Sequence, residues 1–150
     1  MTAGKSAILF LFLGICSYTD IRKKVICVKC LPPFFLTGLI LAALSGKEGL
    51  ISAVLGMAAG LFILLISFIT NGAVGSGDAL ALMVTGVFLG VMKNTELLCL
   101  SLFISAVFSA AALISGRCGR KTELPFLPFI LAAHFLMTAM EYAGLKGGLH

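Results

Sequence analysis

The chain has 150 residues, of which 60% are hydrophobic and only 11% are charged. Because about a quarter of the residues of a soluble domain normally carry a charge, this composition excludes that class and indicates a polytopic membrane protein. The net charge of +5 does not require a nucleic acid partner, since basic loops at one membrane face and anionic lipid account for it.

Between its charged residues the chain has six strongly apolar runs, and each is predicted to form a membrane helix. The runs cover residues 6–19, 31–46, 49–77, 79–92, 97–116 and 124–140, so a polar segment at 93–96 divides the fourth from the fifth. The connections are short enough to make neighbouring helices antiparallel, and no room is left for a soluble domain. The sequence therefore predicts one domain over residues 1–150, an all-α membrane protein built as a bundle of about six transmembrane helices.

The first run has a second interpretation as a cleaved signal peptide, since Lys5 precedes an apolar core. Ile15, however, is too large for the small residue that precedes a processed cysteine. The run also passes directly into Asp20 and a basic cluster. A retained first span is therefore the better interpretation.

Basic residues gather in the loops after the first and fifth predicted spans. The two groups are Arg22, Lys23, Lys24 and Lys29, and Arg117, Arg120 and Lys121. With the N-terminus outside, both loops are cytoplasmic, in agreement with the positive-inside rule. The segment around Asp78 then lies on the same side, so both aspartates of the chain are predicted at the cytoplasmic face of the cell membrane.

Those two aspartates, Asp20 and Asp78, each stand at the end of an apolar run. A carboxylate at the edge of hydrocarbon is costly to keep ionised, so it is a functional-site hypothesis by default. The adjoining runs 6–19 and 79–92 make roughly 21 Å of helix each, against about 30 Å of hydrocarbon. The helices must therefore recruit flanking residues, which places both carboxylates slightly below the membrane surface.

Glycines and prolines predict local geometry around these acids. Residues 71–77 contain three glycines and are predicted to form a loop tucked into the bundle, because glycine disfavours helix. Within it, Gly75 and Gly77 would let the backbone turn tightly and let a substrate approach Asp78. Pro32 and Pro33, and Pro125 and Pro128, suit the first turns of the second and sixth spans.

Small residues at four-residue spacing predict close helix packing in three spans. They are Ser52, Gly56 and Gly60, then Gly86 and Gly90, then Ser101, Ser105 and Ser109.

With these features the chain resembles the type IV prepilin and preflagellin leader peptidases, which are membrane aspartic proteases with a GxGD motif. The first matching element is Asp20 with the basic residues and the aliphatic pair Val25-Ile26 that follow it. The second is Gly75-Ser76-Gly77-Asp78, and the third is the proline-phenylalanine stretch 124–129, with Pro125, Phe126 and Pro128. The three elements occur in the family's order and cover most of the chain.

The resemblance implies an intramembrane aspartic endopeptidase that removes the short basic leader of type IV prepilin-like precursors at the cytoplasmic membrane boundary. Asp20 and Asp78 would be its catalytic pair, without metal or cofactor. Gly75, Gly77, Pro125, Phe126 and Pro128 would shape the loop or bind the substrate. The implied partners are a prepilin-like substrate with a basic leader and membrane lipid, with no nucleic acid; the oligomeric state is left open.

The chain departs from the family pattern at two places. Cys27 and Val28 follow Ile26, where the family usually has proline and asparagine, and Leu80 stands where a lysine is common. Neither departure removes a catalytic carboxylate, but both leave open an altered substrate preference or a low activity. A cysteine-rich insertion near the N-terminus, found in the larger members, is also absent, so N-methylation of the product is left open.

Other functions compete with this interpretation. Asp20 alone is explained as an acid paired with neighbouring basic residues, and Asp78 alone as a helix cap. Together they also fit a small proton- or cation-coupled carrier, although a transport site is expected nearer the midplane. A non-catalytic protein of pilus or secretion assembly is a third candidate.

The remaining reactive side chains carry weaker signals. Cys27 and Cys30 have the spacing of half a zinc site, but no second pair completes it, so reduced thiols are expected. His134 is predicted to be structural, and Glu123 to pair with Arg120 or Lys121. Phe126 and Phe129 are expected to pack in the core, with a substrate groove as their second interpretation.

Overall fold

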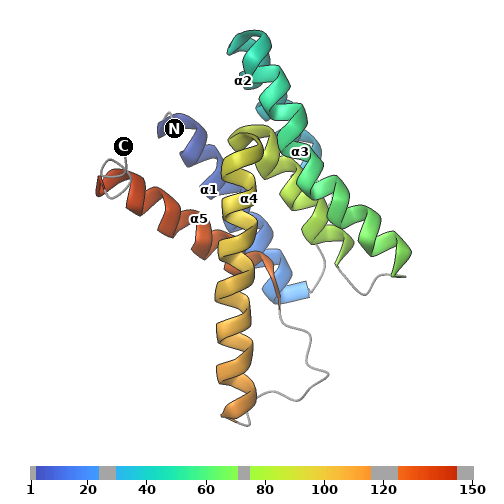
Figure 1. Ribbon diagram of the computed structural model, residues 1–150, viewed down its shortest axis with the longest axis vertical. Helices are drawn as coiled ribbons and strands as arrows, with labels where there is room; N and C mark the ends of the chain where they lie inside the picture. Colours follow the sequence, from blue (N-terminus) through green and yellow to red (C-terminus); the bar gives the residue numbers. More distant parts are fainter. Residues whose placement is uncertain (1–2, 24–29, 71–74, 116–124, 145–150) are drawn as a thin grey trace.

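The computed structural model describes residues 3–23, 30–70, 75–115 and 125–144, and over these residues the chain is entirely helical (Figure 1). The helices are α1 (Ala3–Lys23), α2 (Leu31–Leu44), α3 (Gly46–Ile69), α4 (Ser76–Ile114) and α5 (Leu127–Tyr142). The predicted all-α class is therefore confirmed.

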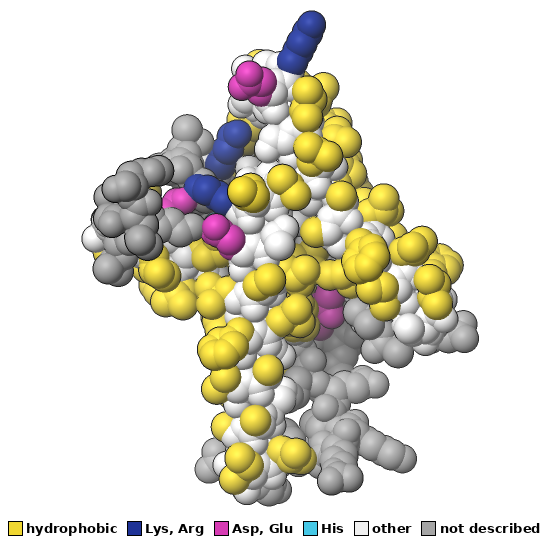
Figure 2. Space-filling view, in the orientation of Figure 1, with side chains coloured by type: hydrophobic (Ala, Val, Ile, Leu, Met, Phe, Trp, Pro, Cys, Tyr) yellow, Lys and Arg dark blue, Asp and Glu magenta, His cyan; other side chains and the backbone are white. Residues whose placement is uncertain are grey.

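Three of these helices are long and apolar enough to cross a membrane: α1 over Gly4–Arg22, α3, and α4. Helices α2 and α5 are apolar but shorter. Hydrophobic side chains cover much of the face seen in Figure 2, while most of the charged side chains visible there lie in its upper part. These features identify a membrane protein, and the number of about six crossings stays a prediction.

Helix α4 is not one straight rod, because Gly90 has non-helical dihedral angles of φ 74° and ψ 175°. A positive φ is disfavoured for residues with a Cβ atom, so the break requires glycine. It divides α4 into residues 76–89 and 91–114, close to the fourth and fifth spans predicted from sequence. The polar segment 93–96, expected to separate those spans, instead continues the second helical segment. That expectation was wrong because the chain reverses at Gly90, before the charged residues.

The fully buried side chain of Asn94 holds the break together. Its Nδ2 donates to the carbonyl oxygens of Leu82 (3.1 Å) and Gly56 (3.0 Å), and its Oδ1 accepts from the Thr85 hydroxyl (2.8 Å). One amide thereby joins both segments of α4 to α3. A buried polar network of this kind is stabilising when its members are satisfied, and it favours a single arrangement.

Helices α3 and α4 approach so closely that their backbones touch. A Cβ atom on Gly56 would lie 2.1 Å from the Gly86 carbonyl oxygen, and one on Gly60 would lie 2.4 Å from the Met83 nitrogen. Within lipid, helices associate through such close packing and hydrogen bonds, because lipid is as apolar as their side chains. The small-residue packing predicted for these two helices is confirmed.

Helix α4 is the central helix of the core and contacts the other four helices, and its first segment meets α2 at Gly38 and α3 at Gly56. Helix α1 faces the core with a stripe of buried residues at helical spacing, and α5 faces it with another. The stripe on α1 is Leu9, Phe12, Leu13 and Cys16, and that on α5 is Leu127, Ile130, Ala133 and His134. The prolines act as predicted, since α2 and α5 each have proline within their first two positions.

The second segment of α4 packs against α5 and then extends beyond the other helices in Figure 1. Near its start, Lys93 forms an ion pair with Glu141 at the end of α5. Farther along, the rings of Phe108 and Phe129 lie 5.4 Å apart. Contacts at both ends therefore fix α5 against this segment.

The backbone contact at Gly56 predicts a specific stability effect. Gly56→Ala should lower the free energy of unfolding by about 1–3 kcal/mol, because the added methyl group meets backbone that cannot rotate away. Gly14→Ala in α1 is the matched control, since no atom lies within 4 Å of its added Cβ. Thermal unfolding in detergent measures both, and equal melting temperatures would contradict the close α3–α4 contact.

Candidate active site

The structure brings the two aspartates together. Asp20 lies in the last turn of α1 and Asp78 in the first turn of α4, and both are half-buried. Their carboxylates are close enough for the two negative charges to interact. Two residues separated by 58 positions in the sequence therefore form a single acidic site at the ends of their helices.

Asp20 is held by the start of α5. The backbone N–H of Leu127 donates to Asp20 Oδ2 at 3.3 Å. Helix α5 has no side-chain cap of its own, because Phe126 occupies the N-cap position. The N–H groups of a first helical turn need acceptors from outside the helix, and the positive end of the helix dipole favours an anion there. Asp20 thus caps α5 from another helix.

Asp78 sits over the glycine that precedes its own helix. Gly75 is the N-cap of α4, and its carbonyl oxygen accepts from the N–H groups of Asp78 (3.1 Å) and Ala79 (3.3 Å). A Cβ atom on Gly75 would lie 2.6 Å from Asp78 Oδ2. Any other residue at this position would therefore displace the carboxylate.

The structural reason that position 75 requires glycine differs from the one inferred from sequence. Its φ of −58° is open to any residue, so close approach of the Asp78 carboxylate, not backbone freedom, requires glycine here. Gly77 is half-buried and belongs to the first turn of α4, where a loop was expected. Gly75 and Ser76 are exposed and not tucked into the bundle; the first part of the predicted loop, 71–74, lies outside the described residues.

The proline-phenylalanine stretch forms the start of α5. Pro125 and Phe126 are half-buried and precede the helix, while Pro128 lies in its first turn. Phe126 packs against the hydrophobic core, which confirms its expected packing role, whereas Phe129 contacts the exposed ring of Phe108. The stretch matters for the site because it positions the Leu127 N–H against Asp20.

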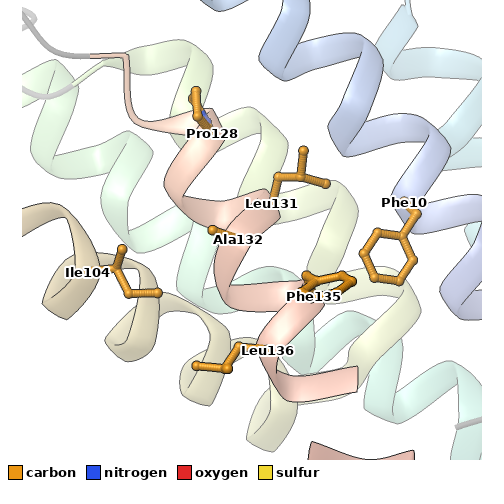
Figure 3. Close-up of a pocket in the computed structure, with 7 residues that line it drawn as sticks. All are labelled: Phe10, Ile104, Pro128, Leu131, Ala132, Phe135 and Leu136. Carbon is orange, nitrogen blue, oxygen red and sulfur yellow. The ribbon is translucent and has the colours of Figure 1, made fainter. Parts of the chain in front are cut away.

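An apolar groove of about 590 Å³ runs along the outward face of α5 (Figure 3). Phe10 of α1 and Ile104 of α4 flank it. Its α5 residues are Pro128, Leu131, Ala132, Phe135 and Leu136. Sequence reasoning missed this groove: the helical spacing of these residues was visible, but α5 is apolar on its core face as well, so the pattern did not distinguish the two faces.

The other reactive side chains lie elsewhere. His134 is buried on α5, and its ring lies 4.6 Å from the ring of Phe10. One ring nitrogen bonds to the backbone of Ser6, whereas Nε2 has no partner among the described residues. Cys16 is buried, Cys30 half-buried and Cys99 exposed. Within the described part of the chain, no three His, Cys, Asp or Glu residues are grouped to hold a metal ion. Cys27, Cys118 and Glu123 lie outside that part.

Comparison with known proteins matches residues 7–114 to the type IV leader peptidase family. The chain belongs to this family. The matched region includes Asp20 and the Gly75–Asp78 motif and ends before the proline-phenylalanine stretch. The resemblance inferred from the motifs is thereby confirmed.

A curated relative from Bacillus subtilis (strain 168), named prepilin leader peptidase/N-methyltransferase, is 38% identical over 133 residues. The match covers 87% of this chain and 53% of the relative, so the chain spans about half the length of that protein. No solved structure matches the chain.

The bond between Asp20 and Leu127 gives Asp20 a structural role that can be measured separately from chemistry. Asp20→Asn keeps a side-chain oxygen that accepts from the Leu127 N–H, whereas Asp20→Ala removes it. We expect Asp20→Ala to unfold at a lower temperature than Asp20→Asn, by the equivalent of about 0.5–2 kcal/mol for a lost helix cap. Thermal unfolding of both variants in detergent tests this, and coincident transitions would show that Asp20 does not cap α5.

Proposed function

We propose that this member of the type IV leader peptidase family is a membrane aspartic endopeptidase that removes the short basic leader from prepilin-like precursors. The observation that carries the proposal is the pairing of Asp20 and Asp78, from helices α1 and α4, at one half-buried site. The printed name of the Bacillus subtilis relative supports the choice of substrate.

A carboxylate pair hydrolyses a peptide when one member is ionised and the other protonated. The ionised member takes a proton from a water molecule, whose oxygen attacks the scissile carbonyl carbon. The protonated member donates to the carbonyl oxygen, giving a neutral tetrahedral intermediate. That intermediate collapses as the C–N bond breaks, the leaving amine takes a proton, and the pair returns to its starting state. Because the pair titrates as a unit, either aspartate can hold the shared proton.

Two helix N-termini partly offset the burial of the pair and the position of Asp20 at the C-terminal end of α1, both of which disfavour negative charge. Asp78 lies at the N-terminus of α4, and Asp20 accepts from Leu127 at the N-terminus of α5. Both helix dipoles therefore direct their positive ends toward the site. The charge of the pair also complements a basic leader, which would be attracted to the same end of the bundle.

The proposed arrangement in the membrane follows from the basic loops. With the N-terminus outside and about six crossings, counting the two segments of α4 separately, the pair faces the cytoplasm within one membrane domain over residues 1–150. A precursor with its leader in the cytoplasm and its apolar helix in the cell membrane then presents its junction at the depth of the pair. The pair lies at helix ends, whereas a transport site is expected near the midplane, so the site favours a peptidase over a carrier.

The proposal predicts that each aspartate is essential for cleavage. Asp20→Asn and Asp78→Asn should each lower the rate on a co-expressed prepilin-like precursor by at least about a hundredfold, the scale of a lost general acid or base. Glu48→Gln, which removes an exposed acid at the start of α3, is the control and should cleave normally. Immunoblots of membranes at equal expression measure precursor and product. Full cleavage by either Asp→Asn variant would rule out the aspartic mechanism.

Gly75→Ala tests whether the position of the Asp78 carboxylate matters. The added methyl group meets the end of a side chain that can rotate, so the fold should survive while the carboxylate moves. Misplacement of a catalytic group by about 1 Å can cost on the order of a hundredfold in rate, and we expect a loss on this scale. Gly14→Ala serves again as control, and the readout is the cleavage rate together with the melting temperature. Unchanged cleavage by Gly75→Ala would contradict the assigned role of this glycine.

A further inference from the structure

Helix α5 links the acidic site to the apolar groove. Its first N–H group, on Leu127, bonds to Asp20, and the next residue, Pro128, is the first groove residue on α5. The groove then follows α5 to Leu136, a distance of about 12 Å at 1.5 Å per residue. The groove thus begins one residue after the Leu127 N–H group that bonds to Asp20.

The groove is a shallow, open hollow with a wall on each side. Phe10 and Phe135 lie with their ring centroids 6.3 Å apart, so α1 forms one wall beside the floor, and Ile104 of α4 forms the other. Figure 3 shows Ala132 between these larger side chains, as the smallest residue of the floor. All seven lining residues are apolar. Such a channel suits the ridge of side chains on an apolar helix, and two turns of helix match its length.

The position of the carboxylates at one end of the groove sets the direction of an occupant. The end at Pro128 adjoins the two carboxylates, with the exposed Arg22 side chain two residues beyond Asp20 and over the Tyr18 ring, whereas Lys93 and Glu141 near the far end form an ion pair. Because only the Pro128 end adjoins the carboxylates, an apolar helix that is to be cleaved at its start fits in one direction, with its start at that end. The other direction would leave the acidic site unused.

We infer that the groove between α1, α4 and α5 docks the apolar helix of the precursor, with the helix start at Pro128 beside the Asp20–Asp78 pair. The inference rests on the proposed peptidase function and adds to it the surface that binds the substrate. Binding along the groove brings the junction between leader and helix to the carboxylates. The groove residues are then specificity-determining and do not take part in bond cleavage.

Photo-cross-linking tests the occupant directly and does not depend on cleavage. A photoreactive amino acid is placed at Leu131 or Phe135 in the Asp78→Asn background and irradiated in membranes containing a prepilin-like precursor. Phe62, an exposed apolar residue of α3, is the matched control position. We expect adducts with the apolar helix of the precursor from 131 and 135 and none from 62. Adducts with lipid alone, or with a second copy of this chain, would overturn the inference.

Kinetics give a second test with a different readout. Ala132→Phe fills the floor of the groove, while Ala58→Phe adds the same bulk to an exposed position on α3. Ala132→Phe should raise KM for the full precursor roughly tenfold with kcat nearly unchanged, as expected when uniform binding is lost. Cleavage of a short peptide that covers the junction but lacks the apolar helix should not change. Equal KM values for the two variants would overturn the inference.

The two tests separate failure of the inference from failure of the proposed function. Cleavage that requires both aspartates, without cross-links from the groove and with an unchanged KM, would remove the groove inference and leave the peptidase. Cross-links from the groove without cleavage by the native chain would support docking and remove the peptidase. Absence of both cleavage and cross-links would overturn both.

Discussion

The backbone contact between Gly56 on α3 and Gly86 on α4 is the constraint on which the rest of the structure depends. Helices in lipid gain little from burying apolar surface against each other, so close packing and internal hydrogen bonds must hold them together. Two glycines allow that closeness, and the Asn94 amide bonds α3 and both segments of α4 at the same level. The first segment of α4 is thereby fixed at the centre of the core, and its start, with Asp78, is placed against the end of α1.

Two helix N-termini contribute to the stability of the acidic site. Asp78 lies at the N-terminus of α4, and Asp20 accepts from the N-terminus of α5. Two helix dipoles thus offset part of the repulsion between two neighbouring carboxylates. Helix α5 has a double role in this account: its end fixes Asp20, and its outward face forms the floor of the groove. The same helix would therefore align a substrate with the group that cleaves it.

Several features were predictable because they depend on local chemistry. The helical class followed from apolar runs, the starts of α2 and α5 from prolines, and the α3–α4 contact from glycine spacing. The pairing of Asp20 with Asp78 followed from motif and topology together. What the sequence could not show were contacts between distant segments. No local sequence pattern indicates that Asp20 caps α5, that Asn94 bridges three helical segments, or that one face of α5 is hollowed. The motif drew attention to Gly75, but it did not show that this glycine contacts Asp78.

The most direct test of the central claim is a cross-linking measurement of whether the ends of α1 and α4 meet at these two positions. Asp20→Cys and Asp78→Cys would be combined in a chain whose five native cysteines are replaced, and treated in membranes with a short thiol-to-thiol reagent. Asp20→Cys with Glu48→Cys is the control pair. Rapid intramolecular cross-linking of the first pair is expected, with little of the second. Equal or absent cross-linking would contradict a shared site and, with it, the aspartic mechanism.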